Sequence, residues 1–93
     1  MQNIVNHIPF GKQNAITRLE LANITNLTDR EVRRLISEAR KETVILSVYG
    51  GKGYFRPTKD ERREVEKWLR KEHSRAVSTF KAMKAARNFV KRG

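Results

Sequence analysis

The sequence predicts a mainly helical α+β protein with one small β-hairpin and, at its carboxyl end, a long basic helix or a helical hairpin. Three observations lead to this prediction. Helix-start signals of the form Thr-x-x-Glu recur three times, a glycine-rich turn separates two β-type runs, and neither Gly nor Pro follows Thr58 before Gly93. A chain of 93 residues without cysteine fits one small domain with at most a short extension and no disulfide framework.

Charge is the most informative property of the composition. Lys and Arg number 21 against 10 Asp and Glu, which gives a formal net charge of +11. The excess lies at the carboxyl end, because residues 58–93 hold twelve bases and five acids, and residues 73–93 hold six bases and no acid. A field of this sign attracts polyanions. We therefore expect a nucleic acid as the partner, ahead of an anionic membrane surface.

Several other classes of protein are excluded by the residues present. The apolar runs are too short for a membrane span and the amino terminus lacks a secretion signal, so we expect a cytoplasmic chain without a membrane partner. The two histidines, His7 and His73, have no second ligand one turn away, which argues against a metal site. The acids at 60–66 fall in the first turns of a helix, where they oppose the helix dipole. We expect no enzyme, no cofactor and no small-molecule ligand.

Two short helices are predicted before residue 25. Ile4, Val5 and Ile8 have helical spacing and are followed by Pro9, which predicts a helix near residues 2–8. The next helix, about 17–24, begins at the signal Thr17-Arg-Leu-Glu20 and would bury Ala22 with either Leu19 or Leu21.

The third predicted helix, about 28–42, begins at Thr28-Asp-Arg-Glu31. Its apolar residues follow the i, i+3, i+4, i+7 rule of a single buried face: Val32, Leu35, Ile36 and Ala39. At about 100° per residue, the opposite face collects Arg30, Arg34, Ser37 and Lys41. Bases also occupy one flank and acids the other: Arg33 and Arg40 against Glu31, Glu38 and Glu42. Charges sorted by sign in this way favour a contact surface over a generic solvated face.

A β-hairpin is predicted after this helix. The run Val44–Tyr49 and the run Tyr54–Pro57 flank the turn Gly50-Gly-Lys-Gly53. This turn lacks the spacing of a phosphate-binding loop. Because side chains alternate along a strand, we expect one of Tyr54 and Phe55 to face the core.

The last helix begins at Thr58-Lys-Asp-Glu61, and its apolar residues fall along one stripe: Val65, Leu69, Ala76, Phe80, Met83 and Val90. Unbroken, it would be roughly 50 Å long, more than a small core can cover. It either breaks near residues 72–75 or packs its second half on a partner. The companion heptad positions are half polar, so we expect a helical hairpin, or an antiparallel contact in a homodimer, rather than a parallel coiled coil. Trp68 and Phe80 are expected in a core or an interface rather than stacked on bases.

This order of elements resembles the winged helix-turn-helix family over about residues 3–57. Residues 11–17, 27–36, Ile45-Leu46 and 51–54 more narrowly resemble small helix-turn-helix proteins of phages and prophages of Gram-positive bacteria. The resemblance implies that the third helix enters the DNA major groove, that the hairpin is a wing, and that a short strand near Ala15-Ile16 pairs with the hairpin. We therefore expect a DNA-binding domain over 1–57 and a basic helical extension over 58–93.

The predicted function is sequence-preferring binding of double-stranded DNA, in transcription control, replication initiation or recombination. Arg bonds guanine in two places, and both Arg and Lys neutralise phosphate. The predicted contact residues are Arg30, Arg33, Arg34, Ser37, Lys41, Lys52, Lys81 and Lys84. The simpler alternatives are helix-surface ion pairs for the arginines, with Glu31 and Glu38, and a solvated turn for Lys52. Two other functions stay open. One is an RNA-binding module, which is disfavoured by an expected lack of exposed aromatic side chains. The other is a protein-interaction adaptor that does not bind DNA.

Overall fold

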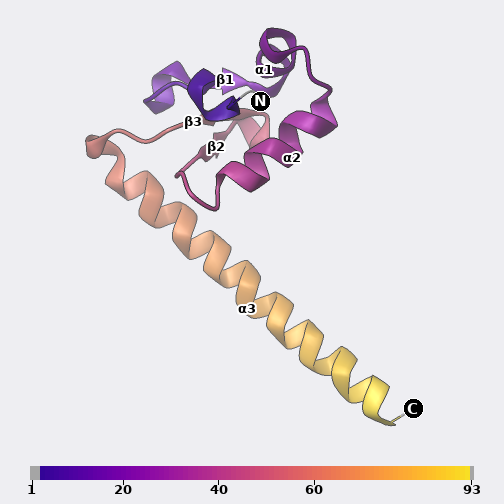
Figure 1. Cartoon of the computed structure of the whole chain (residues 1–93). Coiled ribbons are helices and arrows are strands. Elements are labelled where there is room, and N and C mark those ends of the chain that lie inside the picture. Colours follow the sequence, from indigo (N-terminus) through magenta and orange to yellow (C-terminus); the bar gives the residue numbers. More distant parts are fainter. Residues whose placement is uncertain (1–2, 93) are drawn as a thin grey trace.

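The computed structural model of the chain describes residues 3–92 and is mainly helical, with a small antiparallel sheet (Figure 1). Short helices and strands form a body at one end, and one long helix extends away from it; the molecule measures 51 × 31 × 22 Å. The α-helices are α1 (Arg18–Thr25), α2 (Asp29–Ala39) and α3 (Arg62–Arg92), and the strands are β1 (Ile16–Thr17), β2 (Leu46–Val48) and β3 (Gly53–Phe55). Four 3-10 turns complete the body: η1 (Ile4–His7), η2 (Lys12–Asn14), η3 (Tyr49–Gly51) and η4 (Lys59–Glu61).

All three predicted helix starts are confirmed as capping boxes. The Thr17 hydroxyl accepts from the Glu20 N–H at 3.1 Å, and the Glu20 carboxylate accepts from the Thr17 N–H at 3.1 Å. Thr28 with Glu31 repeats this geometry at the start of α2, and Thr58 with Glu61 repeats it before α3. The N–H and hydroxyl donors of the threonines lower the pKa of Glu20 and Glu31. Each helix start is therefore encoded within four residues.

The core lies where η1, α1, α2 and the sheet meet. Its buried members are Ile4, Ile8, Leu21, Val32, Ile36, Ile45 and Tyr54. Of the two candidates in α1, Leu21 is the buried one and Leu19 is 71% exposed. The first predicted helix is a 3-10 turn over Ile4–His7; residue 2 of the predicted range lies outside the described part of the chain.

The sheet has the strand order β1-β3-β2, and the predicted strand near Ala15-Ile16 is found at Ile16–Thr17. Ile16 faces Tyr54 across β1 and β3, and Leu46 faces Phe55 across β2 and β3. The expectation that one of Tyr54 and Phe55 faces the core is confirmed for Tyr54, and Phe55 is buried as well. Tyr54 belongs to the helical core, whereas Phe55 lines a cavity of about 350 Å³ between the sheet and α3, together with Trp68. Both faces of β3 are thus covered.

The third predicted helix ends three residues early, at Ala39 rather than near residue 42. The chain turns over residues 40–42, and the Thr43 N–H donates to the Ala39 carbonyl at 2.9 Å. Arg40 then donates to the Ile45 carbonyl at 3.0 Å. The helix stops because Ile45, only six residues beyond Ala39, has to return to the core.

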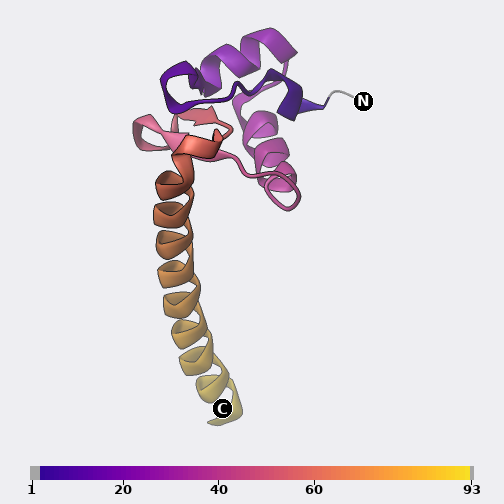
Figure 2. The same ribbon diagram turned by 90° about the vertical axis from the view of Figure 1, so that its left-hand side faces the viewer.

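The predicted helical hairpin at the carboxyl end is wrong, because α3 runs without a break from Arg62 to Arg92 (Figure 2). No Gly or Pro interrupts it at residues 72–75, so local sequence gives no reason to turn. Trp68, which is half-buried, faces the body, whereas Leu69 is 54% exposed and every residue from 73 to 92 is exposed. More than half of α3 therefore extends beyond the body.

We predict that Ile36→Ala lowers the free energy of unfolding by about 2–4 kcal/mol, because Ile36 is 1% exposed at the centre of the core. Urea denaturation measures the change, and Leu19→Ala on the exposed side of α1 is the matched control. Equal effects of the two substitutions would contradict the orientation of these helices.

Candidate nucleic-acid interface

The outer face of α2 presents four of the predicted contact residues together. Arg30, Arg34, Ser37 and Lys41 are exposed, opposite the buried Val32 and Ile36. Lys41 lies in the turn just after the helix because α2 ends at Ala39. The face is available to a partner over three turns.

Two exposed ion pairs form along α2 and the turn that follows it. Arg33 pairs with Asp29 at 3.1 Å and Lys41 pairs with Glu38 at 3.2 Å. Within residues 3–92, neither Arg30 nor Arg34 forms an ion pair; Glu31 is bonded to Thr28 in the capping box, and Glu38 is paired with Lys41. Two guanidinium groups on the outer face therefore have no partner in the described chain.

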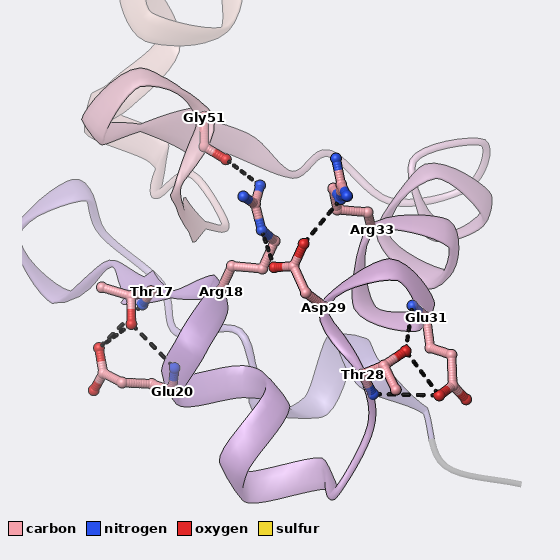
Figure 3. A network of polar contacts seen from close by, with 8 residues as sticks. All are labelled: Thr17, Arg18, Glu20, Thr28, Asp29, Glu31, Arg33 and Gly51. Atoms are coloured by element: carbon pink, nitrogen blue, oxygen red, sulfur yellow. Dashed lines mark hydrogen bonds and ion pairs between the residues drawn. The ribbon is translucent and has the colours of Figure 1, made fainter.

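The position of this face is fixed by Arg18, the first residue of α1 (Figure 3). Its guanidinium donates to the Asp29 carboxylate at 2.5 Å and to the Gly51 carbonyl at 3.1 Å. Its backbone N–H donates to the Lys52 carbonyl at 2.7 Å. The Tyr54 hydroxyl, followed by Asp29, raises the pKa of Arg18. One residue thus joins the starts of α1 and α2 to the tip of the hairpin, a role that the sequence pattern did not indicate.

The hairpin tip, Tyr49–Lys52, has an unusual backbone. Tyr49, Gly50 and Gly51 have φ values of 54°, 63° and 88°, in the left-handed region that glycine tolerates best. At Gly53 a Cβ atom would lie 2.7 Å from a ring carbon of Tyr49, so a glycine is required for the ring to lie there. Lys52 and Tyr49 are both exposed at this tip. The predicted contact residue Lys52 therefore lies beside the surface that Arg18 holds in place.

Arg40 is a further basic residue near this surface, although it was expected only on the flank of a longer helix. Its guanidinium donates to the Ser47 hydroxyl at 2.6 Å and lies 5.9 Å from the centre of the Tyr54 ring. It lines a cleft of about 490 Å³ between the hairpin and α3, shared with Lys71 and Arg75. A contact with the backbone at Ile45, rather than helical periodicity, decides where this side chain lies.

The last two predicted contact residues, Lys81 and Lys84, are not brought to the outer face of α2. Both are exposed on α3, roughly 30 Å along the helix from its first residue. The eight predicted contact residues therefore form two groups, one on α2 and the hairpin and one on the projecting part of α3.

Two further features are absent from residues 3–92. No three His, Asp or Glu side chains gather there as candidate metal ligands. Nor does that part of the chain contain a helix that is both apolar and long enough to cross a membrane. Trp68 packs against the body as expected, whereas Phe80 is 67% exposed on α3.

Comparisons with models of known protein families, with curated proteins and with solved structures find no match to this chain.

We predict that Asp29→Ala lowers the free energy of unfolding by about 1 kcal/mol, because it leaves Arg18 and Arg33 without their carboxylate. We also expect faster amide hydrogen exchange at the hairpin tip, which Arg18 connects to Asp29.

Asp60→Ala is the control, since Asp60 also follows a threonine cap and forms no ion pair within the described residues. If the two substitutions gave the same exchange rates at residues 49–53, the Arg18 connection would not hold the tip.

Proposed function

We propose that this protein binds double-stranded DNA with a preference for sequence, as a winged helix-turn-helix module. The observation that carries the proposal is the outer face of α2, where Arg30 and Arg34 are exposed and form no ion pair within residues 3–92. In this function α2 lies in the major groove, and the hairpin is the wing.

The chemistry of the outer face fits the edges of bases. Arg30 and Arg34 lie in the first half of α2, which is the part of a recognition helix that contacts bases. A guanidinium group bonds O6 and N7 of guanine together, and a serine hydroxyl bonds several base edges. Ser37 continues the same face. Two arginines and a serine on one exposed face supply donors for sequence reading.

The contacts of Arg18 support the proposal that the hairpin is a wing. Its bonds to Asp29 and Gly51 hold the hairpin tip close to the start of α2. In the bound state Lys52, at the tip, neutralises a phosphate beside the groove that α2 occupies. Holding both elements in advance reduces the ordering cost of binding.

The bases of α3 have a different part in this proposal. Residues 73–92 are exposed and contain six bases and no acid. They contact the phosphates of DNA, which adds affinity but gives no preference for base sequence. The process that the protein serves is proposed to be transcription control, replication initiation or recombination, in a phage or prophage setting.

One finding favours RNA as a second candidate. The expectation of no exposed aromatic side chains is wrong, because Phe10, Tyr49, Phe80 and Phe89 are each more than half exposed. Exposed aromatic rings stack on unpaired bases. They lie on separate elements, however, namely the segment before η2, the hairpin tip and α3, and so do not form one platform.

Selection of bound sequences from a random duplex library tests the proposal, with single-stranded RNA as competitor. An enriched motif that survives RNA competition supports DNA reading. Loss of duplex binding to RNA would favour the RNA module. Binding whose affinity does not change with salt would favour an adaptor that does not use the fold on nucleic acid.

We predict that Arg30→Ala and Arg34→Ala each weaken binding to the selected duplex by about 1–3 kcal/mol, with little change in thermal stability. The reason is that both side chains are exposed and form no ion pair in the described chain. Fluorescence anisotropy measures the affinity. Lys59→Ala, which removes one exposed positive charge from η4, is the control and should cost less. A loss of thermal stability with unaltered affinity would argue against the assignment.

We predict that a chain ending after Glu72 still folds but shows a shallower dependence of affinity on salt. The truncation removes six bases and no acid. If three or four of those bases contact phosphates, the slope of log affinity against log salt falls by about 3, at roughly 0.9 per contact. An unchanged slope would show that residues 73–93 make no phosphate contact, and an unfolded product would show that the second half of α3 is needed for the core.

A further inference from the structure

One side of the projecting part of α3 is apolar and uncovered. Phe80, Val90 and Leu69 are 67%, 75% and 54% exposed, and Met83 is 40% exposed. At about 100° per residue, eight residues share a sector about 100° wide, and we call them the α3 seam: Leu69, Glu72, Ala76, Thr79, Phe80, Met83, Arg87 and Val90. In a monomer this stripe of apolar residues would stay in contact with water over six turns, because the body does not cover it.

Antiparallel pairing of two copies about a point between Thr79 and Phe80 brings the seam residues together in pairs. Leu69 and Val90 are equally far from this point, as are Glu72 and Arg87, and also Ala76 and Met83. Two copies of α3 laid antiparallel on this centre therefore place apolar opposite apolar at the ends. Nearer the middle they place the small Ala76 of one copy opposite the larger Met83 of the other. Such self-complementarity is what a two-fold interface between identical chains requires.

The two charges on the seam fix the direction of pairing. Glu72 and Arg87 are the only ionisable residues among the eight, and they have opposite signs. Antiparallel pairing places Glu72 of one copy against Arg87 of the other, twice. Parallel pairing places each charge against its own kind, which is destabilising. In the single chain Glu72 is half-buried at the cleft between the hairpin and α3. Among residues 3–92 its one ion pair is with Arg75, at 3.4 Å, and such a contact is worth little.

The middle of the seam has room for a facing side chain. Ala76, Thr79, Phe80 and Met83 line a groove of about 340 Å³ together with Glu72 and Arg75. The small residues Ala76 and Thr79 leave space beside the Phe80 ring. A large apolar side chain from a second helix fits there as a knob fits a hole in paired helices.

We propose that the occupant of the α3 seam is a second copy of this chain, paired antiparallel about the point between Thr79 and Phe80. Lys81 lies about 140° around the helix from Ala76, so it points away from the seam and stays free. The pairing follows from the seam alone and does not depend on DNA binding. If the partner were instead a different protein with an acidic sequence, nothing would require Arg87 and Glu72 to lie at positions that face each other in an antiparallel pair.

Sedimentation equilibrium on the full chain, without DNA and from micromolar to millimolar concentration, tests the proposal. We expect the mass to rise from 10.9 kDa to twice that value. Glu72→Arg and Arg87→Glu each place like charges at two symmetric contacts and should weaken the dimer at least about tenfold. The double variant Glu72→Arg/Arg87→Glu should dimerise as the original chain does, because the exchange of the two charges again places opposite signs at both contacts.

Lys81→Glu makes the same charge change as Arg87→Glu away from the seam and should leave the dimer at least as tight. Circular dichroism checks that every variant keeps its helix. A chain that stays monomeric at all concentrations overturns the proposal. So does a double variant no tighter than the single ones, since the charges would not then meet across an antiparallel pair.

Discussion

The arrangement of the body depends on one charged contact, the guanidinium of Arg18 between Asp29 and the hairpin tip. Side chains from two helix starts and a backbone carbonyl from a loop meet there, although they are up to 33 residues apart in sequence. The contact sets where the outer face of α2 lies relative to Lys52. Its partner Asp29 also receives Arg33, so a single carboxylate balances two bases. This pairing leaves Arg30 and Arg34 as the bases of α2 that a partner is free to meet.

Features encoded within a few residues could be predicted from the sequence, and features that depend on distant contacts could not. Each capping box needs only a threonine and the glutamate three residues on, and the apolar face of α2 needs only its own period. The end of α2 could not be predicted, because it depends on where Ile45 rejoins the core. The role of Arg18 was missed for the same reason, since Gly51 is far away in the chain. Arg40 shows the opposite case. The helical period of α2 is correct, but the prediction extended it beyond the residue at which the helix ends.

The carboxyl helix shows how local and global preferences can disagree. Its residues favour a helix at every step, but a small core covers only its first turns. Beyond Trp68, Lys81, Lys84 and Arg87 follow each other at intervals of three, a spacing at which like charges repel. Anything that neutralises these bases stabilises the helix, so binding of a polyanion and helix formation favour each other.

Burial of both Tyr54 and Phe55 makes β3 a layer between two packed groups, the helical core on one face and the base of α3 on the other. The body does not support the far half of α3 in any other way, so the contact of Trp68 is the point about which the helix can tilt. With a rise of about 1.5 Å per residue, a tilt of about 10° at Trp68 moves the far end of α3 by about 6 Å. A small change in the packing of Trp68 on the sheet is therefore enlarged into a displacement of several ångströms at Arg92.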